Sequence, residues 1–140
     1  METLTGLLIS VLSIIVGALI GYFLNVKREK QRFINELKIT TASNFISIAH
    51  ESLKHLAVNI SIADATNDKF ELIKLTEVAG LIYKKDTYDL LDDYVGELVM
   101  SIQFYNDEQK TGTKPPNRKE IRDFKKMLND IRTQLRKECK

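Results

Sequence analysis

Residues 4–26 read LTGLLISVLSIIVGALIGYFLNV and contain no charged side chain. This stretch is about as long as the ~20 apolar residues with which a helix crosses a bilayer. The alternatives are a cleaved signal peptide, which has a basic start and a shorter apolar run, and a buried core helix. Because the chain begins Met1-Glu2-Thr3 and charged residues follow Val26 directly, we expect an uncleaved transmembrane helix over 4–26.

Four basic residues follow the apolar stretch and none precedes it: Lys27, Arg28, Lys30 and Arg32. We expect them to contact lipid headgroups. The positive-inside tendency predicts that residues 1–3 lie outside and residues 27–140 in the cytoplasm, with 27–41 as a basic, helical juxtamembrane connector. The expected localisation is a single-pass protein of the cell membrane, with the lipid bilayer as its first partner.

Small residues recur within the predicted span at steps of three and four, on one face of a helix: Gly6, Ser10, Ser13, Gly17 and Gly21. Such spacing lets two membrane helices approach closely. Glycine is also common in membrane helices without any such role. Because the row runs the full length of the span, we expect it to mediate self-association or contact with a partner helix.

Beyond residue 42, apolar residues repeat at helical spacing and no segment shows sustained strand alternation. The spacing predicts helices over 42–63, 70–83, 86–108 and 118–138, with a strand as the alternative for the short stretch 70–83. Three polar or β-branched stretches are expected to interrupt them, namely ITTASN at 39–44 as a weak point, DATNDK at 64–69 and DEQKTGTKPPN at 107–117. Asn117 and Glu120 resemble a capping box. We therefore expect an all-α protein with a cytoplasmic bundle of about four helices over 42–140.

Charge is segregated along the chain. Residues 64–108 carry four basic and eleven acidic side chains, whereas residues 109–140 carry eleven basic and four acidic ones. We expect the acidic helix at 86–108 and the basic helix at 118–138 to pack antiparallel, with opposite charges along their rims. Outside this packing, we expect the basic face of the 118–138 helix to be solvated or to contact anionic lipid. Nucleic acid is not an expected partner, because aromatic residues are not interleaved with the charges.

Candidate chemical sites are few. His50 and His55 lie five residues apart, whereas the metalloprotease motif needs four, so we expect ordinary surface or partly buried histidines and no metal. Asp89, Asp92, Asp93 and Glu97 form an acidic run without a companion nucleophile, which favours a solvated or salt-bridged face. Cys139 is the only cysteine, which excludes an intramolecular disulfide. We expect no cofactor and no enzymatic activity.

The layout, together with the ending IRTQLRKECK at 131–140, resembles uncharacterised small bacterial and prophage-type single-pass membrane proteins with a helical cytoplasmic domain. The resemblance implies no role for any residue. We expect a membrane-anchored, non-enzymatic adaptor or regulator that acts through an unidentified protein partner at the cytoplasmic face. The alternative is a membrane-perturbing effector, of the toxin or phage-defence type, that acts by oligomerisation of its single span.

Overall fold

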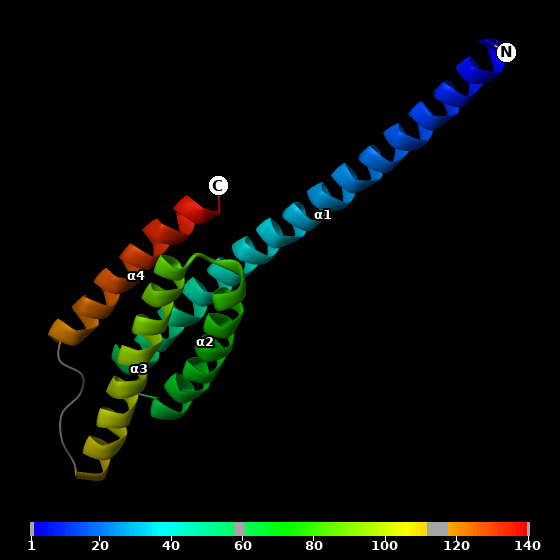
Figure 1. The fold of residues 1–140 in the computed structure, drawn as a ribbon. Coiled ribbons are helices and arrows are strands. Elements are labelled where there is room, and N and C mark those ends of the chain that lie inside the picture. The colour runs from blue at the N-terminus through cyan, green and yellow to red at the C-terminus, as the bar shows by residue number, and fades with distance from the viewer. Residues whose placement is uncertain (1, 58–60, 112–117, 140) are drawn as a thin grey trace. The chain divides into compact units, whose positions relative to one another are not determined.

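The computed structural model describes the backbone of residues 2–57, 61–111 and 118–139, and the side chains of residues 12–57, 61–107 and 119–139. These residues form four α-helices, α1 (Glu2–Ala57), α2 (Ile62–Ile82), α3 (Lys85–Thr111) and α4 (Arg118–Glu138) (Figure 1). The described part of the chain contains no strand. The predicted all-α class is confirmed.

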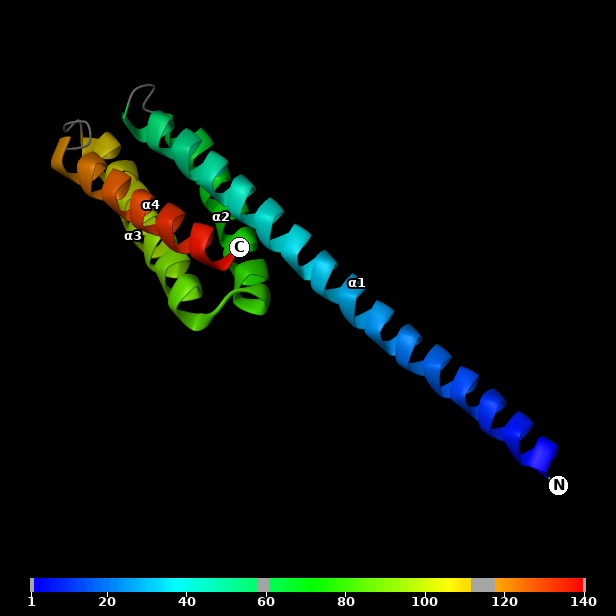
Figure 2. The ribbon, with the colours of Figure 1, turned by 90° about the horizontal axis from the view of Figure 1, so that it is seen from above.

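The chain divides into two compact units, residues 1–36 and 37–140, and α1 continues from the first into the second. In the second unit, the remainder of α1 joins α2, α3 and α4 in a helical bundle (Figure 2). Within this bundle α3 packs against both α2 and α4. The predicted bundle of about four helices is confirmed.

The core of the bundle is centred on Tyr94 of α3, which is fully buried. Its ring packs edge-to-face against Phe45 of α1 and Phe124 of α4, with ring centroids 5.9 and 5.6 Å apart. Its hydroxyl donates a hydrogen bond of 3.3 Å to the carbonyl oxygen of Ala49. The predicted apolar stripes supply most of the remaining core: Leu53, Leu56, Leu91, Val95, Leu98, Ile102, Tyr105, Leu128, Ile131 and Leu135 are all buried.

The transmembrane helix predicted over 4–26 is the main correction. Among the described residues, no helix carries a stretch both long enough and apolar enough to cross a membrane. Residues 4–11 of the predicted span lie outside the described side chains. The expected single-pass topology and the expected localisation in the cell membrane depend on this helix and are therefore corrected too.

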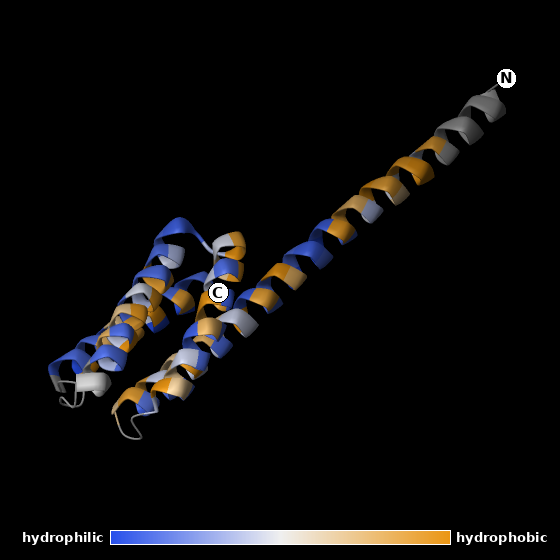
Figure 3. Ribbon diagram, turned by 90° about the horizontal axis from the view of Figure 1, so that it is seen from below, coloured by the Kyte–Doolittle hydropathy of each residue, from blue (hydrophilic) through white to orange (hydrophobic). Residues whose placement is uncertain are grey.

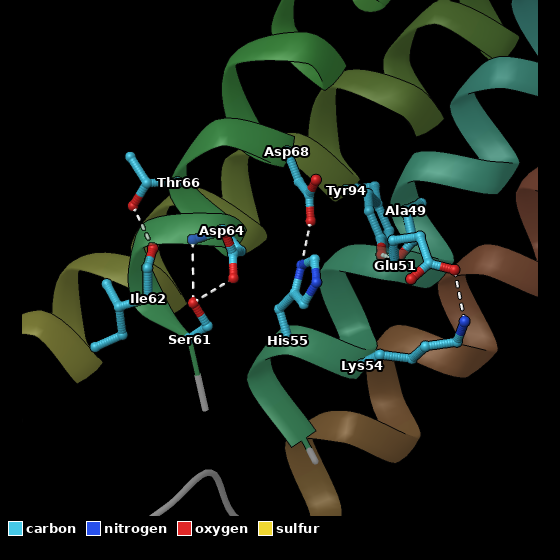
Figure 4. A network of polar contacts seen from close by, with 10 residues as sticks. All are labelled: Ala49, Glu51, Lys54, His55, Ser61, Ile62, Asp64, Thr66, Asp68 and Tyr94. Atoms are coloured by element: carbon cyan, nitrogen blue, oxygen red, sulfur yellow. Dashed lines mark hydrogen bonds and ion pairs between the residues drawn. The ribbon is translucent and has the colours of Figure 1, made fainter. Parts of the chain in front are cut away.

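The prediction of a loop at 64–69 is also wrong, because these residues form the first turns of α2. Ser61 has an extended backbone and caps the helix: its Oγ accepts a hydrogen bond of 3.4 Å from the backbone N–H of Asp64 (Figure 4). Asp64 in the first turn suits the positive end of the helix dipole, and Ala65 is fully buried. The polar composition of residues 64–69 is therefore that of the first turns of a capped helix.

The expected weak point at 39–44 is likewise absent, because α1 is continuous there. Thr41 and Phe45 are buried in the bundle, which offsets the modest helix propensity of this stretch. In the predicted loop at 107–117, residues 107–111 belong to α3. Residues 112–117 lie outside the described residues, and with them Asn117 of the predicted capping box.

Candidate interaction surfaces

The first surface is the apolar segment of α1 between residues 12 and 26. Its large side chains are between 44% and 70% exposed: Leu12, Ile14, Ile15, Val16, Leu19, Ile20, Tyr22, Phe23, Leu24 and Val26. Figure 3 shows this part of α1 as mainly hydrophobic. A helix that is apolar on all sides is normally buried. Residues 12–26 of α1 are therefore a candidate surface for association with another helix.

Three of the predicted association residues lie on one face of this segment, namely Ser13, Gly17 and Gly21. A Cβ atom built on Gly17 or on Gly21 would have no other atom within 4 Å. The backbone on this face is therefore open to close approach by another helix. Gly6 and Ser10 lie outside the described side chains.

The basic cluster that follows is exposed along α1 and consists of Lys27, Arg28, Lys30 and Arg32. Arg32 donates a hydrogen bond of 3.0 Å to Glu36, four residues further on. Such exposed pairs stabilise a helix by only about 0.3–0.5 kcal/mol. The contact of these four residues with lipid headgroups stays a prediction.

Both histidines connect helices of the bundle. His55 Nδ1 lies 2.7 Å from the carboxylate of Asp68, so the end of α1 is tied to α2 (Figure 4). His50 Nε2 accepts a hydrogen bond from the guanidinium of Arg132 on α4. Burial, followed by the positive charge of Arg132, lowers the pKa of His50, which favours the neutral ring that this bond requires. Within the described part of the chain, no group of three or more His, Cys, Asp or Glu side chains could hold a metal ion.

The acidic run on α3 lies in solvent: Asp89, Asp92, Asp93 and Glu97 are all exposed. The two helices α3 and α4 pack together as expected, and the hydroxyl of Tyr105 on α3 donates a hydrogen bond to the carboxylate of Glu120 on α4. The predicted pairing of opposite charges along their rims stays a prediction. Buried contacts such as the packing of Tyr94 against Phe124 join these helices, and Glu97 of the acidic run lines a pocket with Asp123 and Met127 of α4.

The end of α4 is fixed by a polar network around Glu138. Thr87 donates its hydroxyl hydrogen to this carboxylate, and the backbone N–H of Lys84 donates to it at 3.2 Å. The ammonium of Lys38 lies 3.6 Å from the same group. Burial raises the pKa of Glu138, but these bonds and the Lys38 charge outweigh burial and lower it. The network joins α4 to α1 and to the α2–α3 turn.

Sequence reasoning missed both this network and a groove of about 300 Å³ between α1 and α4. The network joins residues 51 and 54 positions apart, which periodicity cannot bring together. The only local signal was a polar Thr87 next to the expected start of a helix.

No protein-family model, curated protein or solved structure matches the chain. The resemblance to bacterial and prophage-type proteins stays a prediction, without its membrane-spanning part.

Proposed function

We propose that the chain is a non-enzymatic helical adaptor or regulator that acts by protein–protein interaction, and that α1 associates with α1 of a second copy through residues 12–26. The observation that carries the proposal is the continuous exposure of large apolar side chains along this segment. The alternative, a membrane-perturbing effector, requires the transmembrane helix predicted over 4–26 and falls with its correction.

The energetics favour a helix as the occupant of this surface. Full burial of one large aliphatic or aromatic side chain contributes about 1.5–3 kcal/mol, whereas association costs an estimated 4–15 kcal/mol. Burying several of the side chains between Leu12 and Val26 therefore offsets that cost. Two identical helices present identical faces to one another, so a single face suffices for a symmetric contact.

The small residues give this association a preferred face. Packed helices normally lie about 8–10 Å apart, and the distance depends on the side chains at the contact. The open backbone at Gly17 and Gly21 allows a closer approach, which brings the flanking Ile14 and Ile20 side chains into contact with the partner. Bulky residues at the two glycines should therefore weaken the contact without altering the rest of the chain.

The test is sedimentation of the full chain over a range of concentrations. We expect the wild type to associate and the double variant Gly17→Ile, Gly21→Ile to associate about tenfold more weakly. Leu19→Phe is the control, because it adds bulk about 160° around the helix from both Gly17 and Gly21. We expect this control to behave as the wild type.

Two results would overturn the proposal. The first is equal association of all three chains, which would make the glycine face incidental. The second is a wild type that stays monomeric at every concentration and instead co-floats with lipid vesicles to the same extent as the variants.

A further inference from the structure

The groove between α1 and α4 lies within the bundle unit and has a volume of about 300 Å³. Its apolar lining comes from Ile39, Ala42 and Ile46 of α1 and Leu135 of α4. Ile39, at one end of the lining, is 54% exposed, so the groove is open to solvent there. An open apolar groove between two helices suits the face of a third helix.

Two arginines of α4 line the groove, and none of its described lining residues carries a carboxylate. Arg132 donates to His50, but a guanidinium has further N–H donors available. Arg136 is exposed and makes no ion pair with any residue that the structure describes. Arginine binds carboxylates with two parallel hydrogen bonds. The groove therefore fits a helix that carries both apolar side chains and carboxylates.

The exposed face of α3 has this composition. Asp89 and Asp93 are exposed, lie four residues apart on one face, and take part in no ion pair among the described residues. The same face continues through Gly96, where an added Cβ would have no atom within 4 Å, to Met100, which is 67% exposed. A helix rises about 6 Å over four residues, so the two aspartates have the same axial spacing as Arg132 and Arg136.

We propose that α3 of a second copy docks in the α1–α4 groove, with Asp89 facing Arg132 and Asp93 facing Arg136. In this register Gly96 passes over Cys139, and Met100 extends towards Ile39. The groove and the α3 face are different surfaces of one chain, so the contact is heterologous and joins the copies into either a closed ring or an open chain. It goes beyond the proposed association of α1 and does not require it.

The test uses disulfide formation between two full-length chains. One carries Gly96→Cys with Cys139→Ser, and the other is the wild type with its native Cys139. After mild oxidation of the mixture, we expect peptides that link position 96 to position 139 to exceed the symmetric 96–96 and 139–139 products. The matched control replaces Gly96→Cys by Asn106→Cys, which is exposed on another face of α3 and should give few such links.

The charges are tested by reversal and rescue. Arg136→Glu in the chain with Cys139 should lower the 96–139 yield about fivefold, in line with the loss of an exposed ion pair. Arg136 has no ion pair within its own described chain, so this change leaves the bundle intact. Asp93→Lys in the other chain should restore the yield. Lys126→Glu, an exposed reversal on α4 outside the groove, should leave the yield unchanged.

The same measurement separates this contact from the association of α1. In chains that also carry Gly17→Ile and Gly21→Ile, we expect the 96–139 yield to stay the same. A yield no higher than that of the Asn106→Cys control, the absence of rescue by Asp93→Lys, or loss of the disulfide in the Gly17→Ile, Gly21→Ile chains would each overturn the proposal.

Discussion

The phenol of Tyr83 donates a hydrogen bond of 2.5 Å to the backbone carbonyl oxygen of Lys38. Tyr83 is the C-cap residue of α2, and Lys38 lies in α1, 45 positions away. The ammonium of Lys38 lies 5.5 Å from the centre of the Tyr83 ring and also pairs with Glu138 of α4. Three helices therefore meet around these two residues.

Replacing Tyr83 by phenylalanine removes this hydrogen bond and leaves the ring in place. Burial raises the pKa of Tyr83, so its hydroxyl stays protonated and donates throughout the neutral range. We expect Tyr83→Phe to lower the free energy of unfolding by about 1 kcal/mol, a typical net value for such a bond. Urea denaturation measures the change, and Tyr88→Phe is the control. Equal stability of Tyr83→Phe and the wild type would show that the bond contributes nothing.

Glu138 predicts a dependence of stability on pH. Its pKa is lowered in the folded chain, so its contribution is present above the unfolded pKa of about 4.3 and is lost as the pH falls through the folded value. Glu138→Gln should therefore destabilise the chain at neutral pH, and the difference from the wild type should shrink below about pH 4. Denaturant titrations at several pH values measure this difference. A difference independent of pH would contradict the assignment.

Apolar contacts, rather than charges, should hold α3 to α4. Leu98 and Ile131 are 0% and 1% exposed, and removing such side chains costs about 2–5 kcal/mol before the cost of burying a charge is added. We expect Leu98→Asp or Ile131→Asp to unfold the bundle. Lys125→Glu with Lys126→Glu, both exposed, should leave it folded. Melting followed by circular dichroism compares the three chains, and an unchanged melt for either aspartate variant would rule out a shared core.

The cap at Ser61 should be measurable as well. Ser61→Ala removes the acceptor for the Asp64 N–H and should lower stability by about 0.5–2 kcal/mol. Ser47→Ala, at an exposed position inside α1, serves as the control, because alanine is the better helix former there. Thermal denaturation of the two variants tests the prediction. If Ser61→Ala proved as stable as Ser47→Ala, the start of α2 would not depend on this side chain.

Periodicity predicted the bundle well where helices are long and regular. The apolar residues that recur at helical spacing on these two helices are buried: Leu91, Val95, Leu98, Ile102 and Tyr105 on α3, and Phe124, Leu128, Ile131 and Leu135 on α4. The polar composition of 64–69 predicted a loop, which is wrong. These residues begin a helix because the side chain of Ser61 caps it. The apolar residues of 4–26 predicted a span that the described helices do not contain.

The candidate surfaces were only partly predictable. The small residues and the basic cluster of α1 are visible as local patterns, and they lie in order along one helix. The groove is different, because Ile39 and Arg132 come from opposite ends of the bundle sequence. The role of Tyr94 was also missed, since its position at the centre of the core depends on Phe45 and Phe124 arriving from two other helices.

The bond between His50 and Arg132 joins positions 82 residues apart, whereas α2 and α3 are separated by two residues only. The entropy lost on closing a loop increases with its length, so we expect the α2–α3 hairpin to form before α4 closes against α1. The seam between α1 and α4 is then the last part of the bundle to assemble and the first to open. Within the bundle, we therefore expect amide hydrogens to exchange with solvent earlier at this seam than in the α2–α3 hairpin.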